Sequence, residues 1–261
     1  MKNNQVILHL NLKTVNRKIR VGAVSYLNAK PLVYGFEKGM MQDIVELSFE
    51  FPSKVASQLM NDEIDIGLVP VAAIPYLKEH HIISDFCIGT EGEVASVCLF
   101  SDVPLQKIET ILLDYQSRTS VILLQIILKD HWKIAPKIII AESGYESEIT
   151  GTTAGLVIGD RAFIQRKKSK YHFDLGLAWK EMTGLPFVFA AWVSNKELSD
   201  VFIKRFNEAI SEGLTHKKEI SDAILYEEYD LLKYYEENIS YELNLSKRNA
   251  LNLFLEKAAK F

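Results

Sequence analysis

The chain has 261 residues, more than the rough 150 residues of one typical domain and fewer than two such domains need. Apolar residues make up 48% and charged residues 25%, which excludes a disordered, collagen-like or repeat-dominated chain. The formal net charge of −4 lacks the basic excess typical of nucleic-acid-binding proteins, so any anionic ligand must be attracted locally.

The cysteines and the N-terminus indicate a cellular compartment. Cys87 and Cys98 form no CxxC motif, and we expect them to be buried free thiols. The apolar stretch at residues 6–12 is interrupted by His9 and Asn11, which makes it a poor secretion signal. No run of about eighteen apolar residues without a charge occurs, so we expect a soluble, cytoplasmic protein that makes no membrane contact.

The first third of the chain alternates strand-like and helix-like segments. Strands are predicted at residues 19–25, 45–51 and 64–70, because these runs are rich in β-branched and apolar residues between turn signals. Helices are predicted at residues 52–62 and 71–78. Such a βαβαβ order predicts a parallel sheet with right-handed crossovers.

A second α/β unit follows Pro104. Its helix is apolar around most of its circumference, which predicts burial on most sides. The predicted elements are strands at 110–115, 137–142, 154–159 and 173–177, a helix at 118–132, and a long β-prone run at 185–194.

The rest of the chain is helical in pattern. Apolar residues recur at three- and four-residue spacing over 198–214, with Ser194 or Asn195 as the candidate N-cap. Further helices are predicted at 219–236 and at 246–260, the latter capped by Ser246. We therefore expect an α/β fold of two lobes joined by two crossings and separated by a ligand cleft. Lobe 1 is predicted to comprise residues 1–101 and 191–261, and lobe 2 residues 102–190.

The common cofactor and metal motifs are missing. The chain contains no GxGxxG, GxxxxGK[ST], HExxH or GxSxG sequence. Its six histidines are scattered, so no metal site is predicted. The basic run at residues 166–170 is interpreted as a solvated loop, and no nucleic-acid partner is expected.

Polar residues follow the first predicted strand. Ser25, Tyr26 and Asn28 precede Pro31, which is suited to starting a helix. Ligands of open α/β sheets bind at the carboxyl ends of the strands, where helix N-termini present free N–H groups. A plain capped turn explains the same residues, since Ser and Asn are common there.

A second polar group lies between a strand and the buried helix. Ser117, Arg118, Thr119 and Ser120 would supply hydroxyls, a guanidinium and free N–H groups, a set suited to binding a carboxylate. The alternative is an N-cap at Ser117 beside a solvated Arg118.

Three further candidates belong to the presumed cleft. Gly159 and Asp160 end a predicted strand, and a glycine there permits a ligand to approach the backbone. Asp160 alternatively caps a helix that starts at Arg161. Ser96 begins a strand-like run near the passage between lobes, where its hydroxyl could reach a ligand.

Several stretches carry a family resemblance. They are VGAVSYLNAKPLVYGF at 21–36, IDIGLVPVAAIP at 64–75, LDYQSRTSVILLQIIL at 113–128, GLVIGDRAF at 155–163 and FDLGLAWKEMTGLPFVFAAWVSN at 173–195. From Ile19 to the C-terminus the chain resembles the chorismate dehydratase family of the futalosine route to menaquinone. The resemblance implies a type 2 periplasmic-binding-protein fold in a protein that is not periplasmic.

The resemblance also implies a chemistry and a site. The reaction is dehydration of chorismate to 3-enolpyruvyloxybenzoate, without a metal or organic cofactor. Asn28 matches a residue expected to matter for catalysis, while Ser96, Thr119 and Ser120 match positions expected to hold carboxylates. The base stays open between the substrate's own carboxylate, Tyr26 and Asp160. One departure is Glu91 to Ser96, where the family pattern has GPV before the serine.

Other functions remain open at this point. A non-catalytic small-anion binding protein would share the fold, because fold does not fix function. The sister enzyme of the same pathway, which acts on cyclic dehypoxanthine futalosine, is the second alternative, and a ligand-sensing transcription-factor domain is the third. The sequence does not predict the oligomeric state.

Overall fold

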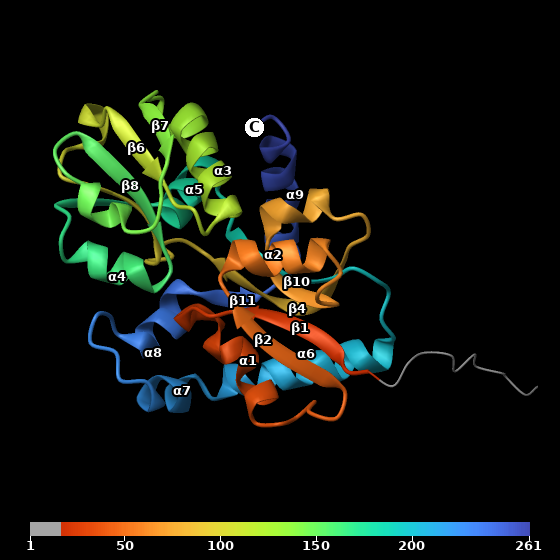
Figure 1. The fold of residues 1–261 in the computed structure, drawn as a ribbon. Helices are drawn as coiled ribbons and strands as arrows, with labels where there is room; N and C mark the ends of the chain where they lie inside the picture. Colours follow the sequence, from red (N-terminus) through yellow and green to blue (C-terminus); the bar gives the residue numbers. More distant parts are fainter. Residues whose placement is uncertain (1–16) are drawn as a thin grey trace, which may run out of the picture.

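Two β-sheets organise the molecule, which was obtained as a computed structural model that describes residues 17–261 (Figure 1). One sheet has the strand order β11-β4-β10-β3-β1-β2 and the other β7-β6-β8-β5-β9. The stretch at residues 6–12, which was assessed as a poor secretion signal, lies outside the described residues.

The first lobe contains the six-stranded sheet. Strand β1 pairs in parallel with β2 and β3, whereas β10 runs antiparallel between β3 and β4. Its elements are β1 (Ile19–Val24), α1 (Lys30–Glu37), β2 (Val45–Glu50), α2 (Pro52–Met60), β3 (Ile66–Pro70), β4 (His81–Thr90), β10 (Phe187–Ser194), α6 (Asp200–Thr215), α7 (Lys217–Ala223), α8 (Leu231–Lys233), β11 (Ser240–Glu242) and α9 (Leu245–Ala258).

The second lobe contains the five-stranded sheet. Its elements are β5 (Val97–Ser101), β6 (Thr110–Leu113), α3 (Arg118–Ile127), β7 (Lys137–Ile140), β8 (Thr153–Ile158), α4 (Asp160–Arg166), β9 (Tyr171–Asp174) and α5 (Leu175–Thr183). Short 3₁₀ and π segments complete both lobes: η1 (Leu27–Ala29), η2 (Val71–Tyr76), η3 (Leu105–Lys107), η4 (Leu128–Trp132), η5 (Tyr145–Glu148) and η6 (Tyr234–Asn238). The βαβαβ start, the second α/β unit and the helical return are thus confirmed.

The strand pairing shifts both expected lobe boundaries. Strand β5 pairs with β8 and β9, so the chain enters the second sheet before Val97 and not after residue 101. All of β10 belongs to the first sheet, so the return also comes earlier than residue 191. The two crossings are therefore short loops, at residues 91–96 and 184–186.

Several helix starts differ from the prediction. The segment 173–177 is not one strand, because Asp174 ends β9 and caps α5 by accepting the Leu177 N–H. Ser199 caps α6 in place of Ser194 or Asn195. Asn244 caps α9 in place of Ser246. Each true cap stands directly before its first helical turn, where a side-chain oxygen reaches free N–H groups.

The segment 219–236 is broken and not a single helix. It divides into α7, α8 and the start of η6, separated by an irregular stretch at 224–230. Strands β4 and β11 were not predicted, and their mutual pairing joins residues far apart in the chain. Local patterns do not encode that pairing.

Helix α3 connects the lobes by its packing. It contacts α5 of its own lobe and also η2 and α9 of the other lobe. Leu123, Leu124, Ile126 and Ile127 are completely buried, which confirms the predicted burial on most sides. The N-terminus of α3 is thereby fixed between the two sheets. No helix within residues 17–261 has the length and apolar character needed to cross a membrane.

Candidate active site

A small inner cavity of about 50 Å³ lies between the lobes. Its polar lining comes from Tyr26, Asn28, Ser117, Thr119 and Ser120, and Gly159 also borders it. The apolar remainder is Val24, Pro52, Pro70, Ile88, Val94, Val97, Ile158, Phe189 and Ala190. The carboxyl ends of β1, β3 and β8 meet there, as expected for ligand sites in α/β folds.

Asn28 presents an unsatisfied acceptor at this cavity. It lies in η1, and α1 begins just beyond at Lys30 with Pro31 in its first turn, close to the predicted start. The Tyr241 hydroxyl donates to the Asn28 backbone carbonyl at 3.0 Å. Within residues 17–261, the buried Asn28 Oδ1 receives no hydrogen bond. Such an atom costs about 1–3 kcal/mol, which a ligand donor would recover.

The Ser117 to Ser120 block serves as a cap and as a cavity wall. Ser117 Oγ accepts the Ser120 N–H at 3.1 Å and donates to Ser120 Oγ at 2.9 Å, so the N-cap interpretation is confirmed. Thr119 Oγ1 accepts the Ala72 N–H of the other lobe at 3.2 Å. Ser117, Thr119 and Ser120 line the cavity, whereas Arg118 is exposed and does not line it.

Tyr26 and Gly159 pack directly against each other across the lobes. A Cβ on Gly159 would lie 3.0 Å from the Tyr26 ring, and its φ of +64° favours glycine. The Tyr26 hydroxyl donates to Gln116 Oε1. Burial raises the pKa of Tyr26, so the phenol stays neutral at ordinary pH and acts as a donor rather than as a base.

Asp160 connects the lobes but does not line the cavity. It accepts the Leu27 N–H at 3.1 Å, and burial raises the pKa of Asp160 to about 6. The predicted cap is wrong, because α4 begins at Asp160 itself and Gly159 occupies the cap position without a side-chain bond. The Tyr226 hydroxyl also donates to the Asp160 carbonyl at 3.1 Å.

Ser25 and Ser96 lie outside the cavity wall. Ser25 is exposed, and its backbone N–H donates to Glu50. Ser96 is fully buried, and its Oγ accepts the Tyr234 hydroxyl at 2.6 Å. Its neighbours Val94 and Val97 line the cavity instead. The cavity is therefore lined by five of the predicted polar side chains and by Gly159. It is not lined by the other predicted residues, which are Ser25, Ser96, Arg118 and Asp160.

The Ser96 backbone is held by a buried carboxylate. Ala95 has a φ of +63°, which is unusual for a residue with a Cβ. Asp174 accepts the Val94 N–H at 3.1 Å and the Ala95 N–H at 2.8 Å. Arg166 donates to the Ala95 carbonyl at 3.0 Å and pairs with Glu93. Arg166 is thus part of an ordered contact, and its assignment to a solvated loop is wrong.

Sequence reasoning missed the contribution of the C-terminal return. Tyr234 and Tyr241 reach Ser96 and Asn28 from 138 and 213 residues away. Burial raises the pKa of Tyr234, so its hydroxyl is a stable donor. Gln116, which contacts Tyr26, precedes the capped helix and could have been noticed from its position.

The described part of the chain contains no candidate metal site and no exposed thiol. No group of three His, Cys, Asp or Glu side chains within residues 17–261 could hold a metal ion. Cys87 and Cys98 are buried free thiols, as predicted. Burial raises the pKa of Cys87 to about 12, so its thiolate is strongly disfavoured.

The family is decided by a match over nearly the whole described chain. A family model described as menaquinone biosynthesis matches residues 19–260. The chain belongs to this menaquinone biosynthesis family. A chorismate dehydratase from Thermus thermophilus is 30% identical over 230 residues, which cover 78% of this chain and 83% of that protein.

Solved structures of similar shape show the fold type of this chain. A crystal structure of an Archaeoglobus fulgidus protein has a TM-score of 0.72 at 16% identity and covers 93% of this chain and 97% of that one. A Candida albicans protein described as having the generic periplasmic-binding-protein fold has a TM-score of 0.60 at 10% identity, covering 94% and 90%. The predicted two-lobe fold of this type is confirmed.

Proposed function

We propose that this protein is a carbon–oxygen lyase that dehydrates chorismate to 3-[(1-carboxyvinyl)oxy]benzoate, the first step of the futalosine route to menaquinone. Membership of the menaquinone biosynthesis family and the 30% identical chorismate dehydratase support the proposal. One observation carries it: Tyr26 and Asn28 of the SYLN block and the three hydroxyl residues of the SRTS block line one interlobe cavity, where Asn28 offers a free buried oxygen. A biosynthetic role on chorismate implies action in the cytoplasm.

The proposed reaction depends more on the orientation of the substrate than on strongly acidic or basic side chains. The ring carbon that bears the enolpyruvyl ether loses its proton, and the resulting charge spreads into the conjugated ring carboxylate. The C–O bond to the neighbouring hydroxyl then breaks, the hydroxyl leaves as water with the proton removed from the ring carbon, and the ring becomes a benzene. Donors at the ring carboxylate stabilise the developing anion.

We assign roles to the cavity residues on this basis. Thr119, Ser120 and the N–H groups at the start of α3 bind one carboxylate, because hydroxyls and a helix N-terminus favour an anion. Asn28 Oδ1 accepts the ring hydroxyl and orients the reacting face. Ser96 helps to bind the carboxylate after the lobes part and the hydrogen bond from the Tyr234 hydroxyl to Ser96 Oγ breaks. Tyr26 remains a neutral donor.

The substrate's own enolpyruvyl carboxylate takes the proton in this scheme. Asp160 has a suitable pKa of about 6, but it stands behind the cavity wall and its carboxylate is already bonded to Leu27. The scheme uses no cofactor, and aromatisation of the ring supplies its thermodynamic driving force.

The test is turnover of chorismate by the purified protein. An aromatic product detected by ultraviolet absorbance and NMR is expected, and Asn28→Ala should lower kcat by at least about tenfold, because a positioning group commonly contributes that much. Asn61→Ala, on an exposed residue at the end of α2, is the matched control. Binding of chorismate without conversion would instead favour a small-anion binding protein, whose fold this chain shares.

A further inference from the structure

A second and larger pocket opens at the mouth of the interlobe space. This outer pocket encloses about 630 Å³, whereas the inner cavity encloses about 50 Å³. Sites for small organic ligands span roughly 300–1,000 Å³, while one water occupies about 30 Å³. A ring dicarboxylate therefore fits the outer pocket as the lobes stand, and reaches the inner cavity only after they part.

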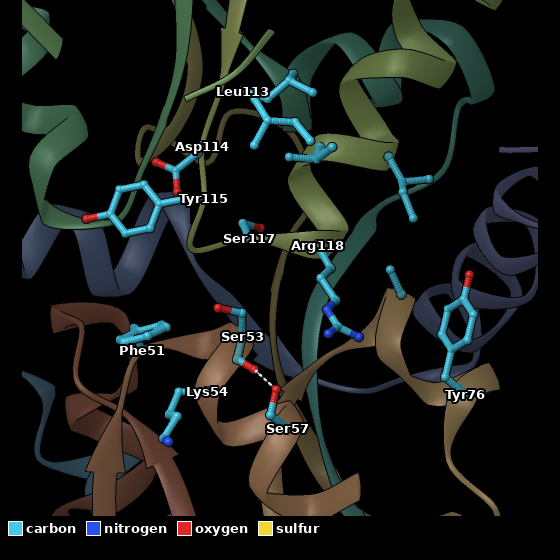
Figure 2. A pocket seen from close by; sticks show the side chains of 14 residues that line it. Phe51, Ser53, Lys54, Ser57, Tyr76, Leu113, Asp114, Tyr115, Ser117 and Arg118 are labelled. Carbon is cyan, nitrogen blue, oxygen red and sulfur yellow. Dashed lines mark hydrogen bonds between the residues drawn. The ribbon is translucent and has the colours of Figure 1, made fainter. Parts of the chain in front are cut away.

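The outer pocket draws on both lobes and joins the inner cavity. Residues of α2 and η2 form one side, and the end of β6 and the start of α3 form the other (Figure 2). Ser117, the cap of α3, borders both spaces. A molecule in the outer pocket thus lies next to the hydroxyls that line the cavity behind it.

Exposed aromatic rings surround the outer pocket. Phe51 is 38% exposed, Tyr76 69% and Tyr115 37%, and all three border the same space. Large aromatic side chains that line one solvent-exposed pocket commonly mark a binding surface, because burying them against a ligand is favourable. Their flat faces suit a planar or cyclic ligand.

The local charge of the outer pocket is opposite to that of the protein. Arg118 extends from α3 toward α2 and its serines, and Lys54 borders the pocket from α2 (Figure 2). Neither cation forms an ion pair within residues 17–261. The one acid of the pocket, Asp114, is already neutralised by Arg161 at 2.6 Å. In a chain of net charge −4, this is a local attraction for anions.

We propose that the outer pocket is a separate binding site for cyclic and aromatic carboxylates. Its aromatic rings hold the ring of the ligand, and Arg118 and Lys54 hold the carboxylate. This role rests on the reaction proposed above. Chorismate binds first in the outer pocket, enters the inner cavity when the lobes part, and is enclosed when they close again. The benzoate product leaves through the outer pocket.

Sodium benzoate is the probe for the outer pocket, because it carries a ring and one carboxylate. Titration calorimetry should give a Kd that rises at least about fivefold in Tyr76→Ala, which changes the outer pocket alone. The Kd should stay within about twofold of wild type in Asn28→Ala, which changes the inner cavity alone. With chorismate as substrate, Tyr76→Ala should lower kcat/KM about fivefold with kcat retained. Lys54→Gln should weaken the dependence of kcat/KM on salt concentration. Lys107→Gln is the control, because Lys107 is an exposed lysine outside the pocket.

The outcomes separate this site from the proposed reaction. A benzoate Kd that is unchanged in Tyr76→Ala, or that is lost in Asn28→Ala, would overturn the outer site even if chorismate is turned over. Benzoate binding that depends on Tyr76 in a protein that leaves chorismate unconverted would retain the outer site and overturn the reaction. Benzoate density in the outer pocket of soaked crystals would support the site directly.

Discussion

The burial of Asp160 makes the stability of the fold depend on pH in a defined direction. Burial raises the pKa of Asp160 from 3.8 to about 6, despite the hydrogen bond from Leu27 and the nearby Lys30. A shift of about two units corresponds to about 3 kcal/mol between the two protonation states. Because Asp160 is mostly buried, solvent screening reduces this figure only modestly.

The sign follows from the protons bound in each state. The folded protein holds the Asp160 proton more tightly than the unfolded chain, so this contribution to stability is complete below about pH 4. It is lost as the pH rises from about 4 through 6. Asp160→Asn keeps an oxygen for the Leu27 N–H and carries no charge, so the variant should not lose that contribution.

Urea unfolding at several pH values between 4 and 7.5 measures the effect. The free energy of unfolding of wild type, relative to Asp160→Asn, should fall by about 3 kcal/mol across that range. Asp43→Asn is the control, because the exposed Arg205 lowers the pKa of Asp43 and the difference should run weakly the other way. A wild-type-to-variant difference that stays constant with pH would refute the reasoning. Retained turnover by Asp160→Asn would also agree with a base other than Asp160.

Further variants test the inner site and the buried carboxylate that supports it. Thr119→Ala combined with Ser120→Ala should lower kcat/KM for chorismate at least about tenfold, because two carboxylate donors are lost; kinetics equal to wild type would end that assignment. Asp174→Asn should destabilise the fold by about 2–4 kcal/mol in urea unfolding, since an amide N–H would then face the N–H of Ala95. Glu93→Gln, which removes only an exposed partner of Arg166, should cost under about 1 kcal/mol, and an equal loss in both variants would contradict the buried role of Asp174.

Local sequence signals located most of the elements and the polar residues that line the inner cavity. The Ser117 cap, the helix start near Pro31 and the β1 and β3 strands depend on residues within a few positions of one another, so their patterns are readable from the chain. The caps of α6 and α9 were missed because several Ser and Asn residues compete there, and only the backbone path selects one.

Contacts between distant segments decided the rest. The Tyr234 hydroxyl reaches Ser96 across 138 positions, and Leu27 reaches Asp160 across 133. These hydrogen bonds determine which polar residues line the cavity and which do not. Local sequence patterns do not predict contacts between residues so far apart in the chain. The sequence by itself determined that polar residues end the strands of two α/β units. Only the packing of the lobes decided that Asn28 keeps a free oxygen while Ser96 and Asp160 are engaged, because burial and partners depend on which surfaces meet.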